Sequence, residues 1–499
     1  MKFLKNFFLL LFVMMFMFGC SSKSGSFSSQ GISSLGKNKI FAVSANYFYE
    51  IKESNNKVLA NKLNKIVKSK FLSLDSFTPN GNRVIFYLQP SVFEYLCSVK
   101  SDGSGFINLS QGLAGNSLEV ALSNDGNKIL FEVQTETGMH TYYVENVDGT
   151  ERKKLGTLDI PPIFSPGGEE VLFAPVSSDG LSNLYITETQ SSVSKNLTGD
   201  MRGTIGKYVF SPEGNKIFFL FWPEQSSSCA LYSMDANGSN RKNLTIEKNI
   251  DIRDFYVLPD NKILYEANDG NANNTYNIYL MNKDGSGKLN LLQGVFGGYE
   301  ITLSPNEDKL ICVRSTNNDE ALYSVNLSGD RVINLSQGLT DGRIMDYGIS
   351  KTEDKIFFLY LKKNLESLYA VDADGNNIKK MFEVTYSKGA IGPIIFSLDG
   401  EKIAFLVSLF SQEAFSELKS ENLYIVESND GTVENLTKGM DIEAYGLIFS
   451  FSPGGNDILV KINKPDLSGT FFIDLKSGKW NNLDDVIKES VVSAMWYPY

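Results

Sequence analysis

The segment F-S-P-E-G-N-K-I-F-F, residues 210–219, decides the fold because the chain repeats its pattern. Each copy has a bulky apolar residue, then a turn built from Pro, Gly, Asn or Asp, then an apolar run. The other copies begin at Phe77, Leu122, Phe164, Leu258, Leu303, Ile349, Phe396 and Phe451. Neighbouring copies start 42 to 55 residues apart. This spacing predicts one structural unit that is repeated side by side along the chain.

Each repeat has the pattern of four antiparallel strands. The proline donates no ladder hydrogen bond, and the glycine two residues later supplies the positive φ of a tight hairpin. K-I-F-F is apolar on both faces, as expected for a sheet packed between two others. A further strand, L-Y-S-M-D at 231–235, leads into the turn D-A-N-G and a short strand closing in N-L-T at 243–245. Four strands in about 46 residues match one blade of a β-propeller.

This order of motifs resembles the TolB-like propeller repeat, which also occurs in the N-terminal propellers of prolyl-oligopeptidase relatives. The resemblance covers residues 39–499. It implies an all-β propeller of four-stranded antiparallel blades. Two copies depart from the pattern: Lys351 replaces the proline in one, and Asp260-Asn261 replaces the Asp-Gly turn in another. These departures affect the type of turn and leave the architecture unchanged.

The two ends of this region predict how the propeller closes. K-I-F-A-V at 39–43 has the pattern of a second strand without a first, and 491–496 has that of a first strand without a second. Together they would form a composite closing blade, giving nine complete repeats plus one, or about ten blades. The alternative is two smaller propellers. The longest insertion, 408–421, falls inside a blade and provides no linker between two rings.

The first 20 residues have the pattern of a lipoprotein leader. Lys2 and Lys5 precede an apolar run, 7–18, which is too short to cross a bilayer as a helix. M-F-G-C at 17–20 resembles a lipobox. We therefore expect a signal peptide at 1–19, a lipid on Cys20 and a Ser-rich tether at 20–38 ahead of the propeller at 39–499. The protein would be held outside the cytoplasm, at an outer membrane or cell surface.

Charge and cysteine content limit the classes of partner. The formal net charge is −11, and removing 1–19 with its two lysines makes it −13. Such a chain repels phosphate backbones, so no nucleic-acid partner is expected. The cysteines beyond the leader, Cys97, Cys229 and Cys312, are odd in number and lie in apolar runs. They are expected to be core residues rather than a disulfide framework.

The sequence predicts no catalytic residue, no metal site and no cofactor. There is no G-x-S-x-G nucleophile motif, and His140 is the sole histidine, at the start of an expected strand. The turns D-A-D-G at 372–375 and D-A-N-G at 235–238 resemble the start of calcium loops. They lack the glutamate at the twelfth position of such a loop, so they are expected to be hairpin turns.

Two periodic side-chain sets have both a structural and a functional interpretation. The N-L-T and N-L-S triplets match glycosylation acceptors, but their fixed place in the repeat favours packing at strand ends. They begin at Asn108, Asn196, Asn243, Asn334 and Asn435. The tyrosines of the L-Y strands favour core packing over a carbohydrate-binding ladder. They are Tyr185, Tyr232, Tyr279, Tyr323, Tyr369 and Tyr424.

These features together favour a membrane-anchored propeller without catalytic activity that binds a protein or peptide partner on one face or near the ring axis. Because propellers carry many functions, the binding residues are not predicted. The alternative is a cell-surface propeller that binds glycans, or degrades them with a pair of carboxylates.

Overall fold

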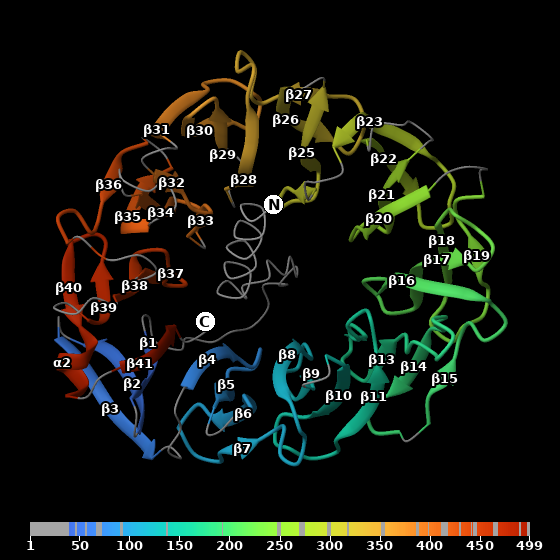
Figure 1. Cartoon of the computed structure of the whole chain (residues 1–499), viewed down its shortest axis with the longest axis horizontal. Helices are drawn as coiled ribbons and strands as arrows, with labels where there is room; N and C mark the ends of the chain where they lie inside the picture. Colours follow the sequence, from blue (N-terminus) through green and yellow to red (C-terminus); the bar gives the residue numbers. More distant parts are fainter. Residues whose placement is uncertain are drawn as a thin grey trace. The chain divides into compact units, whose positions relative to one another are not determined.

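A computed structural model describes most of residues 39–496, which form one compact unit. The stretches outside the description are 45–46, 55–56, 66–71, 90–92, 136–137, 192, 247–250, 269–274, 297–300, 317–318, 351–354, 386–388, 398, 411–417, 429–430, 441, 443–446, 463–467 and 489–490. Within this unit the sheets follow one another around a ring (Figure 1).

Each sheet runs outward from an innermost strand to a second strand. The innermost strands are β41 (Val491–Trp496), β4 (Leu72–Phe77), β8 (Asn116–Leu122), β12 (Ile163–Phe164), β16 (Gly203–Phe210), β20 (Asp251–Val257), β24 (Thr302–Leu303), β28 (Arg343–Ile349), the pair β32 (Gly389–Ile391) and β33 (Ile395–Phe396), and β37 (Leu447–Phe451). The second strands are β1 (Lys39–Ser44), β5 (Arg83–Leu88), β9 (Lys128–Gln134), β13 (Glu170–Phe173), β17 (Lys216–Pro223), β21 (Lys262–Asn268), β25 (Lys309–Thr316), β29 (Lys355–Lys362), β34 (Lys402–Phe410) and β38 (Asp457–Ile462).

A third and an outermost strand complete each sheet. The third strands are β2 (Tyr47–Ser54), β6 (Tyr95–Lys100), β10 (His140–Asn146), β14 (Tyr185–Glu188), β18 (Ala230–Asp235), β22 (Thr275–Asn282), β26 (Asp319–Asn326), β30 (Leu365–Asp372), β35 (Leu418–Glu427) and β39 (Gly469–Asp474). The outermost strands are β3 (Lys57–Lys65), β7 (Ile107–Asn108), β11 (Lys153–Thr157), β15 (Lys195–Asn196), β19 (Lys242–Asn243), β23 (Leu289–Phe296), β27 (Val332–Asn334), β31 (Lys379–Thr385), β36 (Val433–Asn435) and β40 (Lys479–Asn482).

All of these strands pair antiparallel with their neighbours in the sheet, which confirms the all-β propeller of four-stranded sheets. One bridge, Val295 with Arg314, joins β23 to β25 and links two sheets along their edges. The described part contains one short helix, α2 (Leu483–Ile487). No helix in the described residues is long and apolar enough to cross a membrane.

The S-P-E-G turn between β16 and β17 shows why the repeat has its sequence. Ser211 is buried, and its hydroxyl accepts the N–H of Lys216 at 3.1 Å. The N–H of Ser211 in turn donates to the carbonyl of Lys216 at 2.8 Å. Gly214 closes the turn at φ 74°, a left-handed conformation that glycine adopts without a steric cost. The serine therefore fixes the register of the first two strands.

The apolar run of β17 packs on both of its faces. Phe219 and Phe221 lie in a cluster with the sheet β12 to β15, whereas Phe218 and Leu220 lie in a cluster with β20 to β23. Side chains alternate across a strand, so one apolar run fills two interfaces. Equivalent clusters lie between successive sheets around the unit. Burying apolar surface at about 25 cal/mol per Å² makes these interfaces the main source of stability.

The end of the chain pairs with its beginning. β41 lies beside β1, with Ile40 opposite Trp496 and Ala42 opposite Ala494. Ala494 packs against the sheet β37 to β40, and Met495 packs against the sheet β4 to β7. This strand therefore contacts both neighbouring sheets.

The segment 408–421 falls inside one sheet, as expected. Ser408 pairs with Glu421 in the hairpin of β34 and β35. The alternation of apolar residues breaks there, although the hydrogen-bonded ladder continues. The additional residues of this repeat therefore lengthen a hairpin within one sheet.

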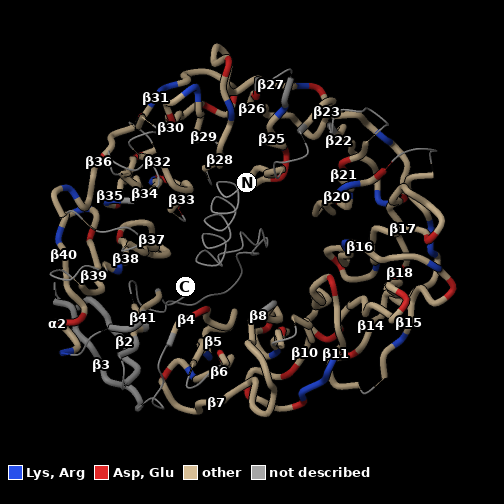
Figure 2. Tube along the Cα trace, viewed as in Figure 1, with Lys and Arg blue, Asp and Glu red and all other residues tan. Residues whose placement is uncertain are grey.

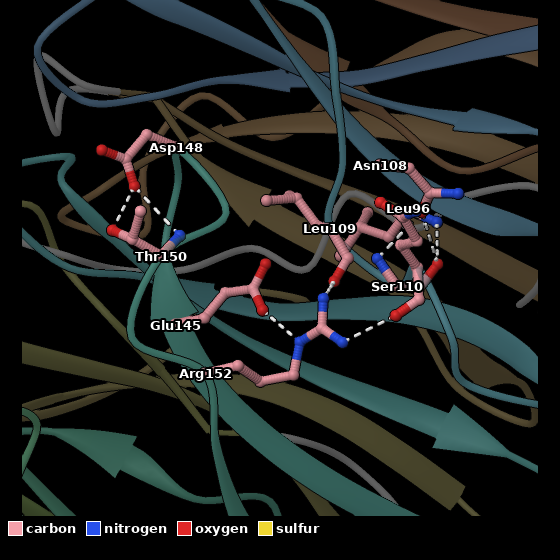
Figure 3. A network of polar contacts seen from close by, with 9 residues as sticks. Leu96, Asn108, Leu109, Ser110, Glu145, Asp148, Thr150 and Arg152 are labelled. Carbon is pink, nitrogen blue, oxygen red and sulfur yellow. Dashed lines mark hydrogen bonds and ion pairs between the residues drawn. The ribbon is translucent and has the colours of Figure 1, made fainter.

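Polar contacts also bridge neighbouring sheets at their outer strands. Arg152, just before β11, pairs with the buried carboxylate of Glu145 in β10 (Figure 3). The same guanidinium donates to the carbonyls of Leu109 at 2.5 Å and Gln111 at 2.8 Å, just beyond β7. One side chain thus compensates a buried charge and links two sheets.

Candidate functional site

Several innermost strands contain a β-bulge near the middle of the strand. The unpaired residues are Asp75 in β4, Val120 in β8, Gly206 and Lys207 in β16, Arg253 in β20 and Met345 in β28. A bulge bends its strand and redirects a side chain. In β16 and β20 the bulges place charged side chains on strands that are otherwise mainly apolar.

A pocket of about 310 Å³ lies at the bulges of β16 and β20. Its apolar wall consists of Ile160 in the loop before β12, Ala174 and Val176 just beyond β13, Ile205 in β16, and Leu220 and Trp222 in β17. Asp159, Lys207 and Arg253 supply its charged groups. A mainly apolar wall with a few polar groups is the usual composition of a ligand site.

Lys207 reaches from β16 to the neighbouring innermost strand. Its Nζ lies 2.7 Å from Asp254 Oδ1 and 4.2 Å from the centroid of the Tyr256 ring. The same carboxylate oxygen accepts the N–H of Phe255 at 2.7 Å. The ammonium is therefore held by an ion pair and by the face of an aromatic ring.

Arg253 is held in a similar way within the sheet β20 to β23. Its Nη1 donates to Glu266 Oε2 at 2.7 Å, and its guanidinium lies 5.2 Å from the centroid of the Tyr276 ring. Burial raises the pKa of Glu266, and the positive charge of Arg253 opposes that rise. The carboxylate is 3% exposed and the arginine side chain 33%, so the cation lies on the solvent side of the pair.

Gly206 allows Trp222 to form part of the pocket wall. A Cβ atom at position 206 would lie 2.2 Å from Cζ3 of the Trp222 ring. Any larger residue would therefore displace the indole. The bulge, the glycine and the tryptophan form one local arrangement that shapes the pocket.

A second pocket, of about 720 Å³, lies at the turns joining strands in the sheets β4 to β7 and β8 to β11. Its lining is almost entirely polar and includes Arg83, Lys100, Asp102 and Asp148. Hydrogen bonds from the hydroxyl and N–H of Ser104 lower the pKa of Asp102. An ionised carboxylate is unsuited to act as the general acid of glycan hydrolysis, so Asp102 does not fit that role.

Comparison with known families agrees with the repeat and the sheets. The model of the TolB beta propeller domain matches residues 114–345. Residues 114–345 therefore contain TolB-type propeller repeats. The match covers the sheets that form the pocket at Lys207 and Arg253, and the repeat pattern continues on both sides of it.

Solved structures similar to this chain include a prolyl endopeptidase, one of two studied for inter-domain dynamics, with 11% identity and a TM-score of 0.42. That alignment covers 68% of this chain and 55% of the endopeptidase chain. A protein described as TolB from Agrobacterium tumefaciens has 16% identity and a TM-score of 0.30, covering 52% of this chain and 91% of that one. At these values neither likeness bears on function.

His140 begins strand β10 of the TolB-type propeller. Its Nδ1 lies 2.5 Å from Glu132 Oε1, and its side chain is 44% exposed. Tyr142, which also hydrogen bonds to Glu132, has a raised pKa because it is buried. An imidazole held by a carboxylate could accept a proton, but catalysis by nucleophilic attack would also need a nucleophile beside it.

The three cysteines are buried and free, as expected from their apolar surroundings. Burial raises the pKa of Cys97 and of Cys312 to about 12, and burial also raises that of Cys229. At neutral pH these thiols stay protonated and are poor nucleophiles or metal ligands. Among the residues that the structure describes, no three His, Cys, Asp or Glu side chains cluster closely enough to hold a metal ion.

The periodic motifs have the structural roles expected of them. Asn243 Oδ1 accepts the N–H of Thr245 at 2.9 Å, and the buried Thr245 hydroxyl accepts the N–H of Leu231 at 3.0 Å. Tyr232 stacks on Phe219 with ring centroids 5.5 Å apart. Turn 235–238 closes by a hydrogen bond from the N–H of Gly238 to the carbonyl of Asp235. Cys20, the expected lipidation site, lies outside the described residues.

The repeat pattern did not reveal Lys207 or Arg253 as site residues. A signal for both was present, because G-K-Y at 206–208 and R-D-F at 253–255 interrupt strands that are otherwise mainly apolar. Recognising them required the bulges, since a bulge changes which side chains face the inner side of a strand.

Proposed function

We propose that this protein is a lipid-anchored, extracytoplasmic propeller that lacks catalytic activity and binds a protein or peptide partner. The observation that carries the proposal is the pocket at Lys207 and Arg253, with two fixed cations beside an apolar wall. This composition suits recognition of a chain that presents both polar and apolar groups.

Anchoring rests on the leader pattern at 1–19, on Cys20 and on the Ser-rich tether at 20–38. Metabolic labelling with a clickable palmitate should mark the wild-type protein. Cys20→Ala should abolish the label and release the protein from membranes. Label that persists in this variant would contradict lipid anchoring at Cys20. We expect delivery to an outer membrane or cell surface, because Ser21 rather than Asp follows the cysteine.

Partner binding can be tested by crosslinking and affinity capture from detergent-solubilised membranes. The double variant Lys207→Met with Arg253→Gln should recover at least about tenfold less partner than the wild type. The matched control is Arg202→Gln, because Arg202 forms an ion pair with Glu224 at 2.5 Å but does not line the pocket. Equal recovery by the double variant would exclude this pocket as the partner site.

The lack of catalysis has its own test at His140. His140→Ala should change partner capture by no more than about threefold, which corresponds to about 0.7 kcal/mol. Purified protein should not hydrolyse peptide or glycan substrates at a rate that depends on this residue. A hundredfold loss of a measurable hydrolysis in the variant would identify an active site instead.

A further inference from the structure

We propose that the pocket at Lys207 and Arg253 recognises a carboxylate carried beside an apolar group. This inference rests on the proposed partner binding and names the chemistry that the pocket selects. The carboxylate could be the end of a peptide chain or an acidic side chain, and the experiment below distinguishes the two.

Both cations retain hydrogen-bonding capacity toward the pocket. A guanidinium has five N–H donors and an ammonium has three. Among the described residues, Arg253 donates to Glu266 and Lys207 donates to Asp254, one bond each. The remaining donors can bind an additional acceptor. A planar guanidinium can also hold a carboxylate through two parallel bonds.

The counter-ions are more deeply buried than the cations they hold. The Glu266 carboxylate is 3% exposed beside an arginine that is 33% exposed. Asp254 is 29% exposed beside a lysine that is 36% exposed. Arg253 and Lys207 line the pocket, whereas the two carboxylates do not. A ligand entering the pocket would therefore meet the cations first.

The apolar wall and Asp159 favour a singly charged carboxylate over a phosphate. Trp222 and Val176, both half-buried, provide a surface that contacts an apolar group. Asp159, exposed at the same pocket, would repel a doubly charged phosphate more strongly than a single carboxylate. The net charge of −11 likewise repels a doubly charged phosphate more strongly than a single carboxylate.

The test measures dissociation constants of small ligands with the full-length protein by saturation-transfer NMR titration. N-acetyl-leucine carries a terminal carboxylate, and N-acetyl-leucinamide is its uncharged match. N-acetyl-aspartyl-leucinamide carries the carboxylate in a side chain. We expect at least one acid to bind about tenfold or more tightly than the amide. The terminal acid binding more tightly would indicate a chain end, and the aspartyl compound binding more tightly would indicate an acidic side chain.

Variants distinguish the contribution of the two cations to binding from that of the shape of the pocket. In Lys207→Met and in Arg253→Gln the preference for the acid should fall to within about twofold, while Arg202→Gln should keep it. Since Arg253→Gln leaves Glu266 buried without its cation, it is also made together with Glu266→Gln. Gly206→Ala, which displaces Trp222, should weaken acid and amide alike.

Three results would overturn the inference: equal binding of amide and acids, tighter binding of inorganic phosphate, or a preference for the acid that survives both cation variants. Partner capture that persists in the double variant would also overturn it, while leaving partner binding by another surface in place. Carboxylate binding without any captured partner would support the inference and contradict the proposed function.

Discussion

Glu366, near the start of β30, is 3% exposed, and its carboxylate accepts the N–H of Ile391 in the next sheet at 2.8 Å. Burial raises the pKa of this carboxyl group, and the hydrogen bond only partly opposes the rise. The folded state therefore keeps this carboxyl group protonated at pH values where the same group in the unfolded chain, with a pKa of about 4.3, has lost its proton. Stability from this group is greatest at low pH and falls as pH rises through the raised pKa.

Glu366→Gln should therefore reduce the dependence of stability on pH. The neutral amide oxygen can still accept the N–H of Ile391 but does not ionise. We expect the fall in Tm between pH 4 and pH 8 to be smaller than in the wild type by roughly 1–3 °C. Thermal unfolding followed by circular dichroism at several pH values measures this difference. A steeper fall in the variant would contradict the assignment.

Individual residues show where sequence reasoning succeeds and where it stops. The turn glycines, the threonine or serine that ends N-L-T or N-L-S, and the tyrosines of the L-Y strands recur at the same place in the repeats that contain them, so their roles could be predicted. Lys207 and Arg253 each occur in one repeat only. Their importance depends on bulges and on neighbouring sheets, which a repeat pattern does not encode.

At the scale of elements, the sheets are joined by packing and by a few buried charges. Arg152 compensates Glu145, whose side chain is 0% exposed, and contacts two carbonyls of the preceding sheet (Figure 3). Along the described strands, lysines and arginines are interspersed with carboxylates (Figure 2). Most ion pairs of the described residues are exposed and should add little, whereas a pair with a buried carboxylate, such as Arg152 with Glu145, should matter.

Arg152→Met should destabilise the protein by about 3–5 kcal/mol, because it leaves Glu145 buried without a cation. The control Arg202→Met removes an exposed pair, with side chains 69% and 41% exposed, and should cost less than about 1 kcal/mol. The double variant Arg152→Met with Glu145→Met should recover much of the loss. Urea unfolding measures all three, and equal effects of the two single variants would refute the role of Arg152.

At this scale the sequence predicted strand order and turns because they depend on local chemistry. The length of the β34 and β35 hairpin was not predicted. Ser408 and Glu421 are paired through backbone hydrogen bonds, which leave no pattern of alternating apolar residues in the sequence. The bridge from Val295 to Arg314 joins two repeats and has no counterpart in the repeat pattern.

For the whole molecule, the pairing of β41 with β1 joins the two ends of the propeller region. The count of about ten blades in this ring stays a prediction. Ala494 and Met495 pack at the two interfaces between this closing sheet and its neighbours.

Truncation after Glu489 should therefore yield insoluble or protease-sensitive protein. It removes about six ladder hydrogen bonds, at about 1 kcal/mol net each, together with apolar packing on both sides. That loss is comparable to the 5–15 kcal/mol total stability of a typical domain. Deleting residues 21–36 should be harmless. Limited proteolysis distinguishes the alternatives, since a stable fragment of about 250 residues would refute the single closed ring.

Partner binding at the inner strands is tested most directly by site-specific photocrosslinking in the native host. Thr204 lines the pocket at Lys207 and Arg253 and is exposed, whereas the exposed Asn127 lines the polar pocket at the turns. A benzoylphenylalanine at position 204 should crosslink a partner, and the same probe at 127 should not. The crosslink should disappear when Lys207→Met and Arg253→Gln are added. Crosslinks that form only from position 127, or that persist in the double variant, would contradict the account.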